Sequence, residues 1–384
     1  MPSSSSDDTM SRRGLLKVSA GMAAGIAALS FIPESLAAAV HTTRRGTAEP
    51  KLKFGVVGIS HAHINSMTDA VIRGGGELTK IHSDEPALLA AFARRYPKAT
   101  VVKTEKEVLE DPEIKLVLSS IVPVERGPLG VRVMQHGKDY LSDKPGITTL
   151  EQLAEIRRVQ AATKKMFYIM YSEHFEVRAA VKAGELVKAG AIGKVIQTMG
   201  VGPHRVSPAT RPEWFWDPKK YGGIITDIGA HQFDQFLFFT GSTKAEIVAS
   251  QVRNVRHPEH PEFQDFGDVM MKGDGGTGYI RLDWFTPDGL PIWGDGRLTI
   301  LGTDGYIELR KYVDIGGVHP GGDNLYLVDQ KGMQYIDCKT VDLPFGPQFV
   351  DDILHRTEVS MTQKACFLAT ELALKAQKMA VKVP

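Results

Sequence analysis

The 384-residue chain has an ordinary globular composition, 42% hydrophobic and 24% charged, and is long enough for two domains rather than one. Its 46 basic and 45 acidic side chains leave a net charge of +1, so it carries no broad electrostatic field for nucleic acid or an anionic membrane. A small molecule is therefore the expected partner.

The first 50 residues are predicted to lie outside the fold. Arg12 and Arg13 form a twin-arginine pattern, followed by an apolar run over residues 18–32 that is too short and too rich in small residues to span a bilayer well. We therefore expect residues 1–39 to be a cleaved twin-arginine export signal and residues 40–50 a linker. The mature protein would then be periplasmic or exported, without a membrane anchor, and the route favours a ligand acquired before export.

From residue 51 onward, short apolar runs alternate with helical patterns. Strands are predicted at residues 53–58, 77–82, 100–102, 116–121, 139–142 and 166–170, and helices at residues 63–73, 86–96, 105–110, 128–136 and 150–163. Alternation at this spacing predicts an α/β fold with a doubly wound parallel sheet, which we assign to a first domain at 51–175.

After residue 175 the pattern changes to one helix near 177–189 and then to β-rich segments joined by Gly, Asp and Pro turns. These segments are 195–201, 245–252, 268–271, 277–284, 297–301, 305–310 and 324–328. They predict an open, mainly antiparallel sheet, closed by an amphipathic helix at 363–378. Residues 176–384 are therefore expected to form an α+β domain for substrate binding and oligomerisation.

The turn after the first strand lies where a dinucleotide-binding sheet places its glycine fingerprint. The pattern Gly-x-Gly-x-x-Gly permits a tight turn and lets backbone amides approach a diphosphate. Here Gly58 holds the first place, Ser60 the second and His63 the third, with His61 between them. The motif alone is therefore a weak signal.

The second strand of such a sheet normally ends in an acidic residue that binds ribose hydroxyls. Ser83 holds that place here, and Asp84 follows it. Asp84 could reach a ribose, but Asp84 and Glu85 are equally typical of acids in the first turn of the next helix.

A more specific segment follows the strand at 139–142. Lys144 and Pro145 come directly after Asp143, at the carboxyl end of a strand, where α/β sheets bind their ligands.

A second specific segment runs from Gly222 to Asp234. On a helix, Asp227, His231 and Asp234 fall on one stripe, which would present two carboxylates and an imidazole to the same surface.

Together the two segments resemble the Gfo/Idh/MocA (glucose-fructose oxidoreductase/inositol dehydrogenase) family, which pairs Glu-Lys-Pro with Gly-Gly-x-x-x-Asp-x-Gly-x-His. The first motif appears as Asp143-Lys144-Pro145, the second is complete, and the resemblance covers residue 51 to the end. It implies a Rossmann-like first domain, NAD or NADP as cofactor, and a homo-oligomer. It also implies that the cofactor is bound by Gly58, Ser60, His61, His63, Ser83, Asp84, Lys144 and Pro145.

The resemblance further implies which residues are catalytic. Lys144 would contact the nicotinamide and the reacting hydroxyl, His231 would be the general acid/base, and Asp227 would hold the substrate. A hydride leaves an alcohol carbon as the hydroxyl proton is removed, and a nearby ammonium favours the alkoxide-like transition state. We therefore expect an oxidoreductase that transfers a hydride between a sugar, polyol or glycoside hydroxyl and a tightly bound nicotinamide nucleotide.

The chain departs from the family pattern where the cofactor is bound, since Ser60 and His63 replace glycines. Imidazole and carboxylate groups near the predicted site suit a divalent metal such as zinc or manganese. The candidate metal ligands are Glu173, His174, Asp227 and His231. The alternative function is therefore a nucleotide-free, metal-dependent lyase or hydrolase acting on a carbohydrate. A non-catalytic sugar-binding protein is a third possibility, against which the retained catalytic residues argue.

An aromatic-rich segment, residues 211–217, precedes the second motif. Its tryptophans, Trp214 and Trp216, could stack on a sugar or could equally belong to the core or to an oligomer contact.

Overall fold

The computed structural model describes residues 52–383. The predicted export signal and linker lie outside the described residues. Among the described helices, none has the length and apolarity needed to cross a membrane.

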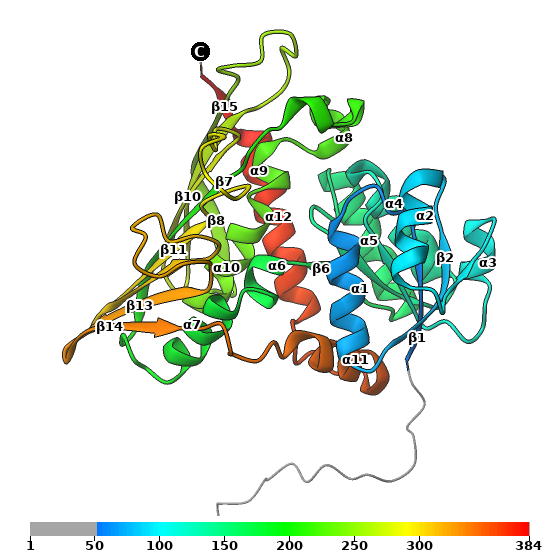
Figure 1. Ribbon diagram of the computed structural model, residues 1–384, viewed down its shortest axis with the longest axis horizontal. Helices are drawn as coiled ribbons and strands as arrows, with labels where there is room; N and C mark the ends of the chain where they lie inside the picture. Colours follow the sequence, from blue (N-terminus) through cyan, green and yellow to red (C-terminus); the bar gives the residue numbers. More distant parts are fainter. Residues whose placement is uncertain (1–51, 384) are drawn as a thin grey trace, which may run out of the picture. The chain divides into compact units, whose positions relative to one another are not determined.

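A six-stranded parallel sheet with the order β3-β2-β1-β4-β5-β6 forms the first lobe (Figure 1). The strands are β1 (Lys53–Val57), β2 (Glu77–His82), β3 (Thr100–Val101), β4 (Leu116–Ser119), β5 (Asp139–Asp143) and β6 (Phe167–Met170). The connecting helices are α1 (His63–Arg73), α2 (Pro86–Arg95), α3 (Glu105–Leu109), α4 (Pro123–Gln135) and α5 (Leu150–Thr163). This order confirms the predicted doubly wound sheet. Its direction reverses between β1 and β4, where such sheets bind ligands.

Helix α4 begins earlier than the sequence predicts. The predicted start at residue 128 rests on Pro128, yet the helix begins at Pro123 and Pro128 lies inside it. Proline is tolerated in the first turn because the amide of that turn has no partner within the helix. Pro123 therefore starts the helix, whereas Pro128 lies in its second turn. There the Val124 carbonyl, which lacks a helical amide because of Pro128, accepts a hydrogen bond from Gln152 Nε2 at 2.9 Å instead.

A nine-stranded sheet forms the second lobe, in the order β14-β13-β12-β11-β7-β10-β9-β8-β15. Its strands are β7 (Val195–Pro203), β8 (Ala245–Arg253), β9 (Phe266–Gly273), β10 (Thr277–Asp283), β11 (Arg297–Gly302), β12 (Tyr306–Arg310), β13 (Asn324–Asp329), β14 (Gly332–Asp337) and β15 (Val381–Lys382). Neighbouring strands are antiparallel except β7 with β10 and β8 with β15. The predicted mainly antiparallel sheet is confirmed, and β14 adds a strand that the sequence analysis missed.

Short helices link the two lobes and lead to the predicted site. They are α6 (Ser172–Phe175), α7 (Arg178–Lys188), η1 (Pro208–Thr210), η2 (Glu213–Trp216), α8 (Pro218–Tyr221), α9 (Ile224–Asp227) and α10 (Ala230–Thr240). Helix α10 packs on β7 and β10, so its buried phenylalanines fill the core beneath the large sheet.

The last two helices return to the first lobe. Helix α11 (Phe345–His355), which the sequence analysis missed, packs against α1, and α12 (Gln363–Met379) contacts β6 and α5 as well as β8 and α10 (Figure 1). The Gln363 amide accepts a hydrogen bond from Phe167 N at 2.8 Å and donates one to Phe167 O at 2.7 Å. Residues of the predicted second domain thus help to build both lobes.

The predicted helical stripe is interrupted at Ile228 and Gly229, between α9 and α10. The Gly229 amide donates to Ile224 O, five residues back, so the turn is widened there. A Cβ at position 229 would lie 2.2 Å from Ile225 O, which only glycine avoids. Asp227 therefore ends one helix while His231 begins the next.

Candidate active site

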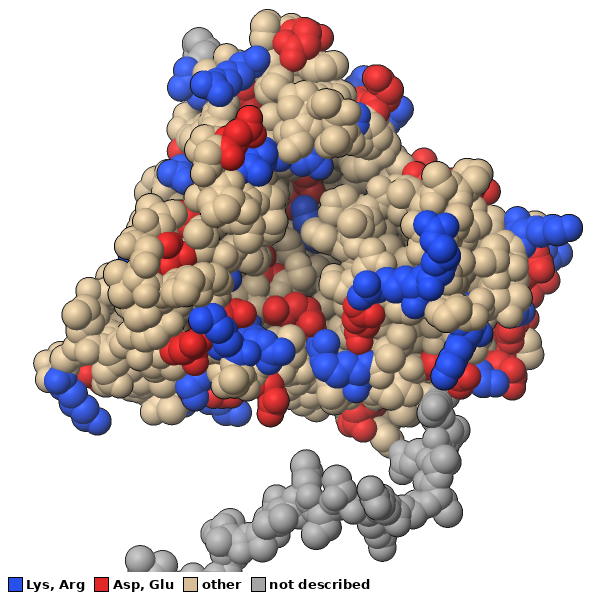
Figure 2. Space-filling model, in the orientation of Figure 1, with Lys and Arg blue, Asp and Glu red and all other residues tan. Residues whose placement is uncertain are grey.

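A cavity of about 250 Å³ lies at the carboxyl ends of β1 and β5 and is lined by both lobes. The surface is hollowed between the lobes in Figure 2. The first lobe contributes His61, His63, Arg126, Asp143 and Lys144, and the second contributes His204, Arg205, Arg211, Trp214, Asp227, Trp284 and Trp293. Two of the three predicted catalytic residues, Lys144 and Asp227, thus line the same cavity, one from each lobe.

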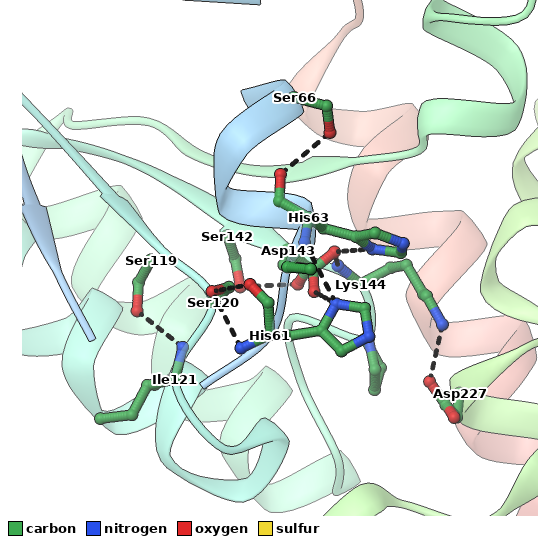
Figure 3. A network of polar contacts seen from close by, with 12 residues as sticks. His61, His63, Ser66, Ser119, Ser120, Ile121, Ser142, Asp143, Lys144 and Asp227 are labelled. Atoms are coloured by element: carbon green, nitrogen blue, oxygen red, sulfur yellow. Dashed lines mark hydrogen bonds and ion pairs between the residues drawn. The ribbon is translucent and has the colours of Figure 1, made fainter. Parts of the chain in front are cut away.

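Lys144 and Asp227 form an ion pair across the two lobes. Lys144 follows β5, Asp227 ends α9, and Lys144 Nζ lies 2.9 Å from Asp227 Oδ1 (Figure 3). Both side chains are largely buried, with exposed fractions of 8% and 14%. Burial alone would raise the pKa of Asp227, but the Lys144 charge holds it below its usual value. The cavity therefore holds an ammonium fixed by a carboxylate.

Asp143, which begins the first motif, is surrounded by three basic side chains. Its Oδ1 lies 2.9 Å from His63 Nδ1, and its Oδ2 lies 3.4 Å from His61 Nδ1 (Figure 3). Arg126 Nη2 lies 3.1 Å from the same Oδ2. Burial would raise the pKa of Asp143, but the charges of His63 and Arg126 hold it well below its usual range. Burial, together with the charge of His63, lowers the pKa of His61 to about 4.

Arg126 is fully buried and ties the segment that carries Lys144 to the loop after β4. It donates to Ile121 O at 2.6 Å, to Pro145 O at 3.3 Å, and to Lys144 O. The hydrogen bonds from the Arg126 guanidinium to the backbone carbonyls of Lys144 and Pro145 fix the position of the Lys144 backbone, from which its side chain enters the cavity.

His231 lies beside this wall and is 3% exposed. Burial lowers its pKa to about 3, so the imidazole is neutral at physiological pH. Its Nδ1 atom has no hydrogen-bond partner within the described chain.

A buried ion pair supports the helix that carries His231. Lys311 Nζ contacts Glu173 Oε2, and both side chains are at most 2% exposed. Glu173 also accepts hydrogen bonds from Gln232 at 3.1 Å and Gln235 at 3.3 Å on α10. Burial would raise the pKa of Glu173, but the charge of Lys311 lowers it to about 2.

His204, at the end of β7, is a second imidazole of the cavity. Its Nδ1 lies 3.1 Å from Gly202 O, and because a carbonyl only accepts, Nδ1 carries the proton and Nε2 is the acceptor. Burial, then the nearby charge of Lys144, lowers its pKa to about 4.

Three of the chain's four tryptophans line the cavity: Trp214, Trp284 and Trp293. The His204 ring packs on Trp293 with centroids 4.5 Å apart and on Trp284 at 5.3 Å. Trp216, for which a sugar contact, a core position and an oligomer contact were all left open, stacks on His260 at 4.2 Å and packs against the core. Aromatic faces of this kind suit the C–H faces of a sugar ring.

The turn after β1 retains the geometry of a glycine fingerprint at its first place. Gly58 has a φ of +77°, and a Cβ there would lie 2.7 Å from Ile121 Cβ, so this turn needs glycine. At the second place, Ser60 Oγ donates to Glu85 Oε2 at 2.7 Å. His63 fills the third place and bonds Asp143 instead of leaving space.

The ends of β1 and β2 place a different acid from the predicted one. Asp84 is almost fully exposed and lies 3.7 Å from His82, whereas Glu85 turns back to Ser60. Ser83 is buried and accepts the Glu85 amide at 3.3 Å. A carboxylate beside the glycine turn suits ribose hydroxyls. The residues at this edge therefore fit a bound dinucleotide, and Glu85 adds a second carboxylate beside the predicted Asp84.

The four predicted metal ligands do not gather around one point. His174 Nδ1 bonds Asp234 Oδ2 at 2.8 Å, Glu173 is engaged by Lys311, and Asp227 by Lys144. Among the described residues, the grouping that could hold a metal is His61, His63 and Asp143, whose ligand atoms lie within 4.8 Å of one another. The four ligands predicted for the alternative function are therefore not assembled around one point, whereas His61 and His63 of the turn after β1 come together with Asp143.

Sequence reasoning did not single out His204, Trp284 and Trp293 as cavity residues. The parallel pairing of β7 with β10 sets Pro203 opposite Asp283, which places the residues after both strands at one sheet end. No local pattern reports that pairing, because the two strands are far apart in the sequence. The position of His204 just after a predicted strand is the one sequence feature that could have indicated it as a cavity residue.

Comparison with known proteins defines the class. The family model described as "Oxidoreductase family, NAD-binding Rossmann fold" matches residues 52–171, and the one described as "GFO/IDH/MocA C-terminal domain" matches residues 180–308. The chain therefore contains an NAD-binding Rossmann domain of an oxidoreductase family. It belongs to the Gfo/Idh/MocA family, as the motifs predicted.

Solved structures agree with this assignment. A protein of Erwinia carotovora atroseptica, described as an oxidoreductase, is 46% identical with a TM-score of 0.84, and the match covers 87% of this chain and 100% of that one. Levoglucosan dehydrogenase, solved with NADH and levoglucosan, is 14% identical with a TM-score of 0.71, covering 85% and 97% of the two chains. At that identity the likeness concerns the fold alone.

Curated relatives match over a shorter stretch. The 1,5-anhydro-D-fructose reductase of Ensifer adhaerens is 26% identical over 198 residues, 51% of this chain and 59% of the relative. An NADP⁺-dependent scyllo-inositol 2-dehydrogenase of Bacillus subtilis is 26% identical over 152 residues, 40% of this chain and 42% of the relative. The matches thus span about half the length of these relatives.

Proposed function

We propose that this protein transfers a hydride between a hydroxyl of a sugar, polyol or glycoside and a tightly held nicotinamide nucleotide. The observation that carries the proposal is the Lys144–Asp227 ion pair, which lies in an aromatic-walled cavity shared with the turn after Gly58. The names of two curated relatives, a 1,5-anhydro-D-fructose reductase and a scyllo-inositol 2-dehydrogenase, support a carbohydrate-like substrate.

A nicotinamide dinucleotide would be held by the turn at Gly58 and Ser60, by Glu85 and by Lys144, and when bound it accepts or donates the hydride. Lys144 donates a hydrogen bond to the reacting oxygen and stabilises its developing negative charge. Asp227 holds that ammonium in place and accepts a second substrate hydroxyl. His231, neutral because of its burial, accepts the hydroxyl proton during oxidation and returns it during reduction.

We further propose that the protein leaves the cytoplasm by the twin-arginine route with its nucleotide already bound. A freely exchanging nicotinamide would be of little use outside the cytoplasm, so a retained cofactor must be regenerated in the same site. N-terminal sequencing of exported protein tests the route: we expect a mature chain beginning near Val40, and retention of Arg12 and Arg13 would contradict it.

The nucleotide itself is tested by denaturing purified protein and separating released small molecules by chromatography, alongside elemental analysis. We expect nearly one nucleotide per chain and no stoichiometric metal. The competing function is the metal-dependent lyase or hydrolase, for which the His61, His63 and Asp143 grouping is the favouring observation. Stoichiometric metal without nucleotide, and no binding of added NAD or NADP, would establish that alternative instead.

A further inference from the structure

Four lysine and arginine side chains line the cavity, and they differ in whether a carboxylate forms an ion pair with them. Three are paired with carboxylates: Arg126 with Asp143 at 3.1 Å, Lys144 with Asp227 at 2.9 Å, and Arg205 with Asp288 at 3.3 Å. The fourth, Arg211, has no described carboxylate within ion-pair distance. The cavity therefore contains one cation whose charge is not neutralised by an ion pair within the described chain.

The hydrogen bonds of Arg211 leave most of its donors unused. Its Nε donates to Val206 O at 2.7 Å and one Nη2 hydrogen to Arg205 O at 3.1 Å, both backbone carbonyls. A guanidinium carries five N–H donors, so these bonds fix the group and leave others for a ligand.

Aromatic rings pack against the guanidinium, which is partly buried. The Arg211 guanidinium carbon lies 4.4 Å from the Phe215 ring centroid and 5.0 Å from that of Trp284. Burial lowers the pKa of Arg211, because a charged group in these surroundings loses hydration, while the more distant charge of Asp227 raises it. A desolvated and preorganised cation of this kind favours an anionic ligand.

We propose that Arg211 binds the carboxylate of the substrate, and that the substrate class is the sugar acids, either aldonic or uronic. The inference rests on the proposed function and extends it, since it names the substrate class of the same cavity. Lys144 and Asp227 then receive a hydroxyl of that acid, and the tryptophans pack on its carbon chain or ring. A carboxylate is planar and matches the fork of a guanidinium with two parallel hydrogen bonds.

The test is titration calorimetry on the full chain as purified, with D-gluconate and D-glucuronate as probes. Their neutral counterparts, D-glucitol and D-glucose, differ only in the carboxylate. We expect the acids to bind about ten- to a hundredfold more tightly than the neutral compounds, the range of a hydrogen-bonded charge pair. Arg211→Gln should remove that preference and leave the weak binding of the neutral compounds unchanged, and Arg211→Lys should restore part of it.

The control is Arg256→Gln, because Arg256 also lies over an aromatic ring, at 5.8 Å from the Phe285 centroid, but outside the cavity lining. It should bind all four probes as the unaltered chain does. Thermal unfolding of each variant shows whether the fold is kept.

Equal binding of acids and neutral compounds, or equal weakening of both by Arg211→Gln, would overturn the proposal. Preference for D-glucose 6-phosphate over D-glucuronate would assign the site to a phosphate ester instead of a carboxylate. Because calorimetry needs no turnover, these outcomes are independent of whether the released nucleotide is found. The sugar-acid inference and the hydride-transfer function can therefore fail separately.

Discussion

Two neutral imidazoles compete for the role of proton acceptor. His231 occupies the family's histidine position, and its buried Nδ1 has no partner within the described chain. His204 lines the cavity directly, with its tautomer set by Gly202 O. Burial keeps both neutral at pH 7, with pKa values of about 3 and about 4, so protonation state does not separate them.

We expect His231→Asn to lower kcat by about 10²–10⁴, the usual contribution of a general base. His204→Asn should change kcat less than about tenfold and mainly raise KM, because a wall residue contributes to binding. The measurement is steady-state kinetics of both variants on one established substrate. A large fall in kcat for His204→Asn with little effect of His231→Asn would move the acid/base role to His204.

At the scale of elements, the site depends on one ion pair that joins two segments. Lys144 leaves the end of β5 and Asp227 ends α9, so the pair connects the parallel sheet to the helix beneath the large sheet. Removing one partner of a buried pair leaves the other charge without compensation. Loss of either partner should therefore lower the stability of the fold as well as the activity.

Lys144→Met should lower the free energy of unfolding by about 3 kcal/mol, because Asp227 is then buried without a counter-charge. The double variant Lys144→Met with Asp227→Asn should regain part of that loss but no activity. The measurement is urea unfolding at pH 7. Lys382→Met is the control, since its pair with Glu262 is exposed and should contribute less than about 1 kcal/mol.

The same pair predicts a pH dependence. The pKa of Asp227 is lowered in the folded state, so its stabilisation is complete above the unfolded value of about 4 and is lost as the pH falls through the lowered value. The stability difference between the unaltered chain and the double variant should therefore shrink in acid. A difference that stays constant down to pH 2 would contradict the assignment.

The sequence predicted the elements that have a clear periodicity and missed those set by tertiary contacts. The six parallel strands and α1 were predicted nearly residue for residue, because buried strands and amphipathic helices carry their own patterns. The break in the helix at Gly229 was not predicted, because it depends on the close approach of the Gly229 backbone to Ile225 O. The sequence analysis did not choose Glu85 as a cofactor ligand, because only the folded turn shows that this acid faces Ser60.

At the scale of the whole molecule, the large sheet presents apolar side chains on its outer face. Met199 on β7, Tyr279 on β10 and Met270 on β9 lie in register across three neighbouring strands. Met199 is 45% exposed and Met270 is 53% exposed, while the alternating residues between them are buried against the helices. An exposed apolar row of this kind is typical of an interface between subunits.

We propose that two copies of the chain associate through this face, since an exposed apolar row can pack on the same row of a second copy about a two-fold axis. Light scattering after size exclusion should give twice the mass of one chain. The pair of changes Met199→Lys and Met270→Lys should give the mass of one chain, because lysines would be buried against each other. Ile315→Lys is the control, as Ile315 is exposed but lies outside the sheet. A single-chain mass for the unaltered protein would exclude the dimer.

The Glu173–Lys311 pair constrains how this chain can evolve. Position 173 lies in the short helix entering the second lobe and position 311 follows β12, and neither charge is hydrated. A single mutation at either position would leave the other charge buried without a partner and would destabilise the fold. Single substitutions at these two positions should therefore be selected against. In related chains these positions should covary, with Glu and Lys kept or replaced together, and relatives that keep Glu173 opposite a neutral residue would contradict this.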